Sequence, residues 1–83
     1  MKTVTVYSAD WCPYCNRAKG LLKNKGIAYT EINVDKVPGA REKIMAQTGM
    51  KTIPQIFIGE EFVGGYAELA ALEAEGELDD LLK

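Results

Sequence analysis

The sequence predicts an α/β fold in which one four-stranded mixed sheet is flanked by helices. Short β-rich segments alternate with segments whose apolar residues recur at helical spacing, in the order β-α-β-α-β-β-α. The chain has 83 residues, so we expect residues 1–83 to form a single small domain. Its composition, 47% hydrophobic and 27% charged, is typical of a soluble globular protein.

The first half of the chain predicts a β-α-β unit. Residues 3–7 are rich in β-branched and aromatic side chains and predict a buried strand. Residues 13–25 place apolar side chains at helical spacing, and Gly26 is a plausible helix stop. Residues 27–34 predict a second strand, which should lie parallel to the first after a right-handed crossover.

The second half predicts two more helices around a hairpin. A helix is expected from Pro38, which suits a first turn, to about Thr48, with Gly49 as its C-cap. Two short strands are expected at 55–58 and 62–63, joined by a glycine-containing turn at 59–61. A third helix is expected over 66–75, and a closing helical turn over 78–82.

Composition and charge exclude several functional classes. The formal net charge of -2 leaves no broad basic surface, so no nucleic acid partner is expected. The absence of histidine excludes Cys-His and Ser-His catalysis and His-containing zinc sites. The N-terminal residues lack the apolar core of a signal peptide, and no apolar run is long enough to cross a bilayer. We therefore expect a cytoplasmic protein without membrane contact.

Cys12 and Cys15 form a Cys-x-x-Cys motif where the first predicted strand gives way to the first predicted helix. Pro13 fits helix position N1 and stiffens the turn, which makes Cys12 the N-cap. Free backbone N–H groups and the helix dipole then favour the thiolate of Cys12, the nucleophile in disulfide exchange. Cys15, one turn further on and more buried than an exposed Cys12, would resolve the mixed disulfide. Trp11 and Tyr14 place aromatic rings beside the sulfurs. The pattern predicts a thiol–disulfide oxidoreductase.

Three other interpretations of the cysteine pair stay open. Half of a zinc site would need two further ligands, and the chain has two cysteines and no histidine. Two inert cysteines buried in a helix would not explain the position at a strand–helix junction. An iron–sulfur cluster would need thiolates from a partner chain or a cofactor, because it takes four. We expect no metal in the protein.

Three motifs together resemble those of dithiol glutaredoxins, and the likeness is greatest to small bacterial members. They are Cys12-Pro13-Tyr14-Cys15, Thr52-Ile53-Pro54 and Gly64-Gly65, in family order over the whole chain. The resemblance implies a thioredoxin fold and a monomeric enzyme that reduces protein disulfides and glutathione mixed disulfides. It also implies glutathione as the electron donor and ribonucleotide reductase as one protein partner.

The resemblance further implies a glutathione site. In the family, the proline that matches Pro54 is cis and leaves the backbone of Ile53 free to pair with the cysteine of glutathione, as an added strand would. The helix start after Gly65 would bind the γ-glutamyl carboxylate, and Glu68 would take the ammonium group. The expected contact residues are Tyr14, Lys51, Thr52, Ile53, Pro54, Gly65, Tyr66, Ala67 and Glu68.

The sequence departs from the family pattern at three places. Many relatives carry a lysine shortly before the first cysteine, whereas Asp10 occupies that turn here and, if close, would oppose the thiolate. Ala67 replaces a residue that is usually polar or acidic, and Tyr66 is bulky where relatives often have a small residue. Lys51 is the candidate to replace the missing lysine by pairing with the glycine carboxylate of glutathione, and Arg41 is a weaker one.

Simpler interpretations and rival functions also stay open. Pro54 can open a strand edge without binding anything, Gly64-Gly65 is common at helix caps, and Lys51 can be a solvated surface charge. One rival function is a redoxin recycled by thioredoxin reductase. Another is a carrier that holds an iron–sulfur cluster between two chains with glutathione, although such carriers more often have a single thiol and a less rigid turn.

Overall fold

The computed structural model describes residues 2–83, so only Met1 of the predicted domain lies outside the described residues. Its elements follow the predicted order, with the closing turn forming a fourth helix. They are β1 (Val4–Ser8), α1 (Pro13–Asn24), β2 (Tyr29–Asn33), α2 (Ala40–Thr48), β3 (Gln55–Ile58), β4 (Glu61–Gly64), α3 (Tyr66–Ala74) and α4 (Leu78–Leu82). The predicted α/β class is confirmed.

The four strands form one mixed sheet in the order β2-β1-β3-β4. β1 pairs parallel to β2 and antiparallel to β3, and β3 pairs antiparallel to β4. The predicted parallel β-α-β unit and the predicted hairpin are therefore both present. All four residues of β3 are buried, as expected for a central strand that is covered on both faces.

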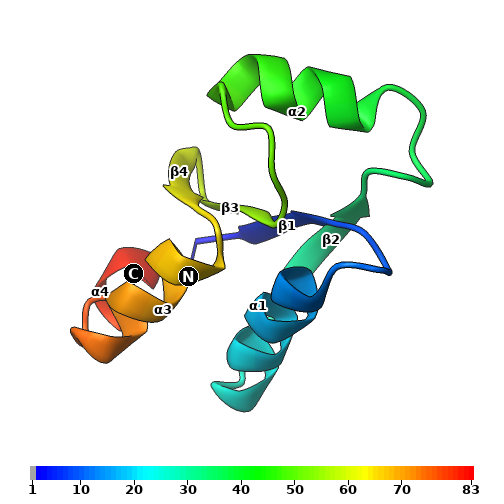
Figure 1. Cartoon of the computed structure of the whole chain (residues 1–83). Helices are drawn as coiled ribbons and strands as arrows, with labels where there is room; N and C mark the ends of the chain where they lie inside the picture. The colour runs from blue at the N-terminus through cyan, green and yellow to red at the C-terminus, as the bar shows by residue number, and fades with distance from the viewer. Residues whose placement is uncertain (1) are drawn as a thin grey trace.

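Helices cover both faces of the sheet: α2 lies alone on one face, and α1, α3 and α4 lie on the other (Figure 1). The larger core cluster joins the sheet to α1, α3 and α4. Its buried members are Val4, Val6, Ala18, Leu22, Ile27, Ile56, Ile58, Leu69, Leu78 and Leu82. A smaller cluster joins the sheet to α2 through Ala9, Val34, Ile44 and Phe57. Successive side chains of β1 and β3 therefore point in turn into the larger and the smaller core cluster, because side chains alternate between the two faces of a strand.

Several predicted boundaries were off by one or two residues; for example, the strand expected over 27–34 spans Tyr29–Asn33. Two of these differences have a clear cause. The second helix begins at Ala40 and not at Pro38, because Gly39 has a left-handed φ of 78° that cannot belong to a right-handed helix. Glu61 belongs to β4 and not to the turn, because it pairs with Ile58. That pairing leaves a two-residue turn at positions 59–60.

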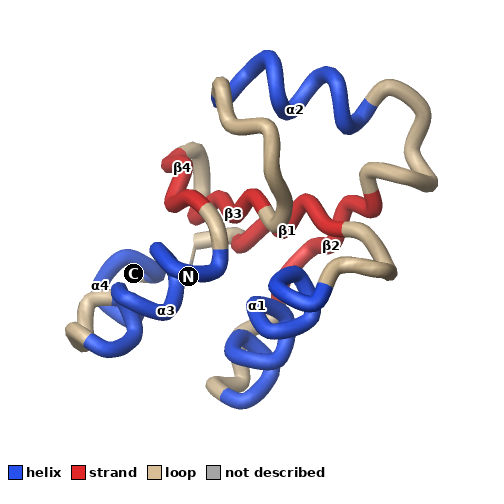
Figure 2. Tube along the Cα trace, in the orientation of Figure 1, coloured by secondary structure: helices blue, strands red, loops and turns tan. Residues whose placement is uncertain are grey.

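Long loops join α2 to the sheet on either side, whereas α3 and α4 follow the hairpin closely (Figure 2). The loop after α2 begins at Gly49, whose φ of 77° confirms the predicted C-cap. α4 closes the structure by burying Leu78 and Leu82, and the backbone N–H of Lys2 donates to the carbonyl of Leu82 at 2.7 Å. Among residues 2–83, no helix has both the length and the apolar character needed to span a membrane.

Candidate active site

Cys12 caps the N-terminus of α1, as the sequence predicts. Its backbone is extended, with φ -92° and ψ 112°, and Pro13 is the first helical residue. This arrangement is local in origin, because a residue before proline favours extended backbone and proline lacks the N–H that a first helical position leaves unused. The Cys12 Sγ accepts a hydrogen bond from the backbone N–H of Cys15 at 3.2 Å. A thiolate at Cys12 would be stabilised by that donor and by the helix dipole.

Both cysteines are free thiols, and both are buried. Cys15 is fully buried, as expected, but Cys12 exposes only 4% of its surface, so the prediction of an exposed Cys12 was wrong. The loop before β3 explains the difference, because the Cys12 Sγ–H donates to the Ile53 carbonyl across 3.7 Å. A disulfide substrate must therefore reach a sulfur that lies against the backbone of this loop.

Burial also controls the titration of the second thiol. Burial is the largest of the causes that raise the pKa of Cys15 to about 12, and the hydrogen bond and charge of Cys12 act in the same direction. A backbone hydrogen bond from Ala9 and the positive charge of Lys19 act in the opposite direction. In the reduced protein at neutral pH, Cys15 therefore stays protonated.

The loop before β3 carries the second predicted motif. The Ile53–Pro54 peptide bond is cis, as the family resemblance implied, and Pro54 is buried. The side chains of Lys51 and Thr52 are exposed to solvent. The structure thus places the Ile53 backbone against Cys12 and leaves Lys51 at the surface.

The start of α3 carries the third predicted motif. Gly64 has a φ of 125°, and a Cβ added there would lie 2.8 Å from the side chain of Glu68. A Cβ on Gly65 would lie 3.4 Å from the Pro54 carbonyl oxygen, so this backbone passes close to the cis-proline loop. Glu68 Oε1 accepts a hydrogen bond from the Gly65 N–H at 2.7 Å, which is ordinary capping of the helix start. Ala67 is exposed.

Aromatic side chains connect the two helix starts. The rings of Tyr14, in the first turn of α1, and Tyr66, in the first turn of α3, have centroids 6.3 Å apart. The Arg17 guanidinium lies 5.0 Å from the Tyr14 ring centroid, a cation–π contact that the sequence analysis missed. The cysteine pair, the cis-proline loop and the start of α3 therefore converge on one region of the surface.

Asp10, one of the departures from the family pattern, is paired with residues at and after the end of β2. Its carboxylate accepts a hydrogen bond from Asn33 Nδ2 at 3.0 Å and lies 3.2 Å from Lys36 Nζ. The lysine offsets the negative charge of Asp10.

Trp11 also turns toward the β2–α2 loop. It is 65% exposed, and its indole N–H donates to Asp35 Oδ2 at 2.7 Å. Arg41 lies 2.6 Å from the other oxygen of Asp35 and, with Trp11, holds the pKa of that carboxyl below its usual value. Arg41 is thus already paired, which argues against a role for it in binding the glycine carboxylate of glutathione.

Gln55, at the start of β3, is a site residue that the sequence analysis missed. It is fully buried. Its amide Nε2 donates to the carbonyls of Met50 and Thr52 at 2.9 and 3.0 Å, and its Oε1 accepts from Thr48 Oγ1 at 2.7 Å. These bonds span the loop that ends at Pro54. The available signal was a glutamine opening an otherwise apolar strand.

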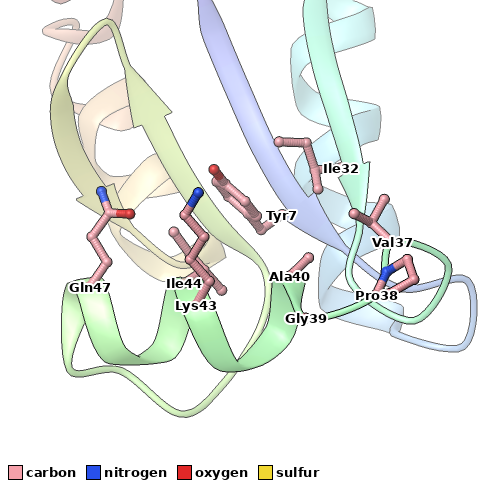
Figure 3. A pocket seen from close by; sticks show the side chains of 9 residues that line it. All are labelled: Tyr7, Ile32, Val37, Pro38, Gly39, Ala40, Lys43, Ile44 and Gln47. Atoms are coloured by element: carbon pink, nitrogen blue, oxygen red, sulfur yellow. The ribbon is translucent and has the colours of Figure 1, made fainter.

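A separate hollow of about 290 Å³ lies between α2 and the sheet. Figure 3 shows Tyr7 and Ile32 reaching it from the strands and Lys43 and Gln47 from α2. Its lining includes no residue of the cysteine pair, of the cis-proline loop or of the start of α3. The hollow is therefore distinct from the thiol site. Within residues 2–83, no group of three or more Cys, Asp or Glu side chains is placed to hold a metal ion.

Comparison with known proteins agrees with this geometry. Residues 4–63 match the family model described as glutaredoxin. Glutaredoxin 3 of Escherichia coli (strain K12) is 45% identical over 83 residues, which is 100% of both chains. The solution structure of glutaredoxin from Brucella melitensis has a TM-score of 0.88 at 48% identity, covering 100% of this chain and 90% of that one.

A more distant relative shows the same architecture. The crystal structure of a buckwheat glutaredoxin–glutathione complex has a TM-score of 0.90 at 29% identity, covering 95% of this chain and 74% of that one. The fold is thus the thioredoxin fold that the resemblance implied. Identity over the full length, together with the Cys-x-x-Cys helix cap, shows that the chain belongs to the glutaredoxin family of glutathione-dependent thiol–disulfide oxidoreductases.

Proposed function

We propose that Cys12 is the attacking thiolate of this glutaredoxin and that Cys15 is its resolving thiol. Cys12 attacks a disulfide and forms a mixed disulfide with one half of it. Cys15 or glutathione then displaces the reduced product, and glutathione re-reduces the protein. The observation that carries the assignment is the 3.2 Å hydrogen bond from the Cys15 N–H to the Cys12 Sγ, because it places Cys12 at the donor-rich end of α1 with Cys15 behind it.

The proposed glutathione site lies across the three converging segments. The cysteine of glutathione would pair with the backbone of Ile53, whose carbonyl is 3.7 Å from the Cys12 Sγ. The first turn of α3 offers N–H groups that have no acceptor within the helix, and these suit the γ-glutamyl carboxylate. Tyr14 and Tyr66 would flank the peptide. The buckwheat relative solved with glutathione supports a site of this kind in the family.

Two charged side chains would complete recognition of glutathione. Glu68 would take the ammonium group, and its position is fixed by the hydrogen bond from the Gly65 N–H. Lys51 is exposed and would pair with the glycine carboxylate. With Arg41 already paired to Asp35, Lys51 is the better of the two basic candidates.

The proposed substrates are protein disulfides and glutathionylated proteins, with ribonucleotide reductase as one protein partner suggested by the family. A dithiol pair that is reduced by glutathione needs a reducing compartment, so we place the protein in the cytoplasm. We also propose that residues 1–83 act as one domain and as a monomer.

The direct test is turnover on a glutathione mixed disulfide, with NADPH consumption as the readout. We expect steady turnover when glutathione and glutathione reductase recycle the protein. Thioredoxin reductase in place of that pair is expected to support little or none. Turnover with thioredoxin reductase alone would contradict glutathione dependence and favour the rival redoxin.

Replacing Gln55 by leucine should weaken glutathione binding. The leucine keeps the volume but leaves the carbonyls of Met50 and Thr52 without their donor, so the loop that presents Ile53 loses its fixed position. We expect KM for a glutathione mixed disulfide to rise about tenfold, with a smaller change in kcat. Gln47→Leu, the same change at an exposed position of α2, is the matched control. An unchanged KM in Gln55→Leu would show that the loop does not depend on Gln55.

A further inference from the structure

Lys19 is the cation of α1 that lies one helical turn after the resolving thiol. It follows Cys15 by four residues, so the two side chains share one face of the helix, and helical side chains lean toward the N-terminus. The Lys19 side chain is 17% exposed, and its Nζ lies 2.9 Å from Glu31 Oε2 on β2. The same oxygen accepts a hydrogen bond from the buried Ser8 Oγ at 2.6 Å. The ammonium group is therefore held between α1 and the sheet.

Cys12, the N-cap of α1, and Lys19, within α1, change the pKa of Cys15 in opposite directions. Burial raises the pKa of Cys15 most, and the neighbouring Cys12 raises it further by a hydrogen bond and by its charge. The backbone of Ala9, directly after β1, lowers that pKa by a hydrogen bond, and the positive charge of Lys19 makes a smaller contribution in the same direction.

Groups on the sheet act on Lys19 in turn. The hydrogen bond to Glu31 raises the pKa of Lys19 most, and Tyr29 and Cys15 add to the rise. Glu31 is itself held ionised by Ser8 and Lys19, with Lys36 as a further positive charge, and these lower its pKa. Lys19 therefore remains charged over the whole range in which a thiol enzyme works.

Formation of the mixed disulfide changes this balance. Once Cys12 is bonded to the substrate sulfur, it carries no charge and no thiol, so its two effects against the Cys15 thiolate disappear. The charge of Lys19 remains. We propose that Lys19, held by Glu31, is a positioning residue that favours the Cys15 thiolate at this stage and so sets the rate of the resolving step. The proposal rests on the roles given to Cys12 and Cys15 above.

The step itself balances without any further reactant. Cys15 gives its proton to solvent, and its thiolate attacks the Cys12 Sγ. The Cys12–Cys15 bond forms while the bond from Cys12 to the substrate sulfur breaks. The substrate leaves as a thiolate, so two electrons pass from the two protein thiols to the original disulfide.

The test is a single turnover of the reduced protein with dithiobis(nitrobenzoate), an aromatic disulfide that releases one coloured thiolate at each exchange. The first phase reports attack by Cys12, and the second reports resolution by Cys15. In Lys19→Met we expect the pH profile of the second phase to move up by about one unit. At neutral pH the second phase would then be about tenfold slower, because the thiolate fraction falls tenfold per unit. The first phase should stay within about twofold.

Matched variants separate charge from packing. Lys19→Arg keeps the positive charge and should retain the second phase, whereas Lys19→Gln should behave as Lys19→Met does. Lys23→Met removes an exposed lysine one turn further along α1 and should change neither phase. A Lys19→Met protein with an unmoved second phase, or with both phases slowed alike, would overturn the proposal. Failure of the function proposed above would look different, since a Cys12→Ser protein would then keep its first phase.

Discussion

The Cys12→Ser variant is expected to lose turnover on protein disulfides and on glutathione mixed disulfides by about a thousandfold or more. A serine hydroxyl is not ionised at neutral pH and does not attack disulfides, so neither the dithiol nor the monothiol route can start. The helix start should survive, because serine is among the best N-cap residues and can accept the hydrogen bond from the Cys15 N–H as the sulfur does. The measurement is NADPH consumption in the glutathione-coupled assay.

Two controls make this result specific to the sulfur. Thermal unfolding of Cys12→Ser should stay within a few degrees of the parent, as expected for a change of about 1 kcal/mol or less in a domain of this size. The alkylation rate of the remaining thiol should be low at neutral pH, since Cys15 is fully buried and burial raises its pKa. Substantial turnover by a folded Cys12→Ser protein would show that Cys12 is not the nucleophile.

The Cys15→Ser variant is expected to separate the two activities. Reduction of protein disulfides should fall by about a hundredfold, because the mixed disulfide at Cys12 has lost its intramolecular resolving thiol, and intramolecular attack has a high effective concentration. Turnover on glutathione mixed disulfides should stay within about threefold of the parent, because free glutathione can release Cys12. Parallel assays with a protein disulfide and with a glutathione mixed disulfide give the ratio.

The trapped intermediate provides a second readout for Cys15→Ser. Mass spectrometry of the variant, after mixing with a protein disulfide and without glutathione, should show the covalent mixed disulfide at Cys12. The parent should show only its oxidised Cys12–Cys15 form. Equal loss of both activities in Cys15→Ser would contradict the division of roles between the two cysteines.

The fold was largely predictable because its signals are local. β-rich segments alternate with helical spacing, and Gly26 and Gly49 both end helices in the structure with a left-handed φ. The start of α2 was not predictable in this way, since Pro38 satisfies the rule for a first helical turn. The left-handed φ of 78° at Gly39, which moves the start to Ala40, depends on how the loop reaches the sheet.

The motifs of the site were predictable from the sequence, but the long-range contacts and hydrogen bonds that hold them in place were not. The cysteine cap is a property of four consecutive residues, whereas the contact between Gly65 and the Pro54 carbonyl requires the finished sheet. The hydrogen bond from Trp11 to Asp35 joins positions 24 apart in sequence, and no local pattern indicates it. Gln55 was missed for the same reason, because its partners are mainly backbone carbonyls of a loop whose path the sequence does not reveal.

The burial of Cys12 has a consequence for the choice of protein substrates. With 4% of its surface exposed and the Ile53 carbonyl 3.7 Å from its sulfur, Cys12 leaves little room for an incoming disulfide. A tripeptide or a disordered tail can approach such a sulfur without cost to its own structure. A disulfide that staples a rigid domain would first have to fray locally, and the free energy of that opening adds to the barrier. We therefore expect the enzyme to sort its substrates by the mobility of the chain around their cysteines.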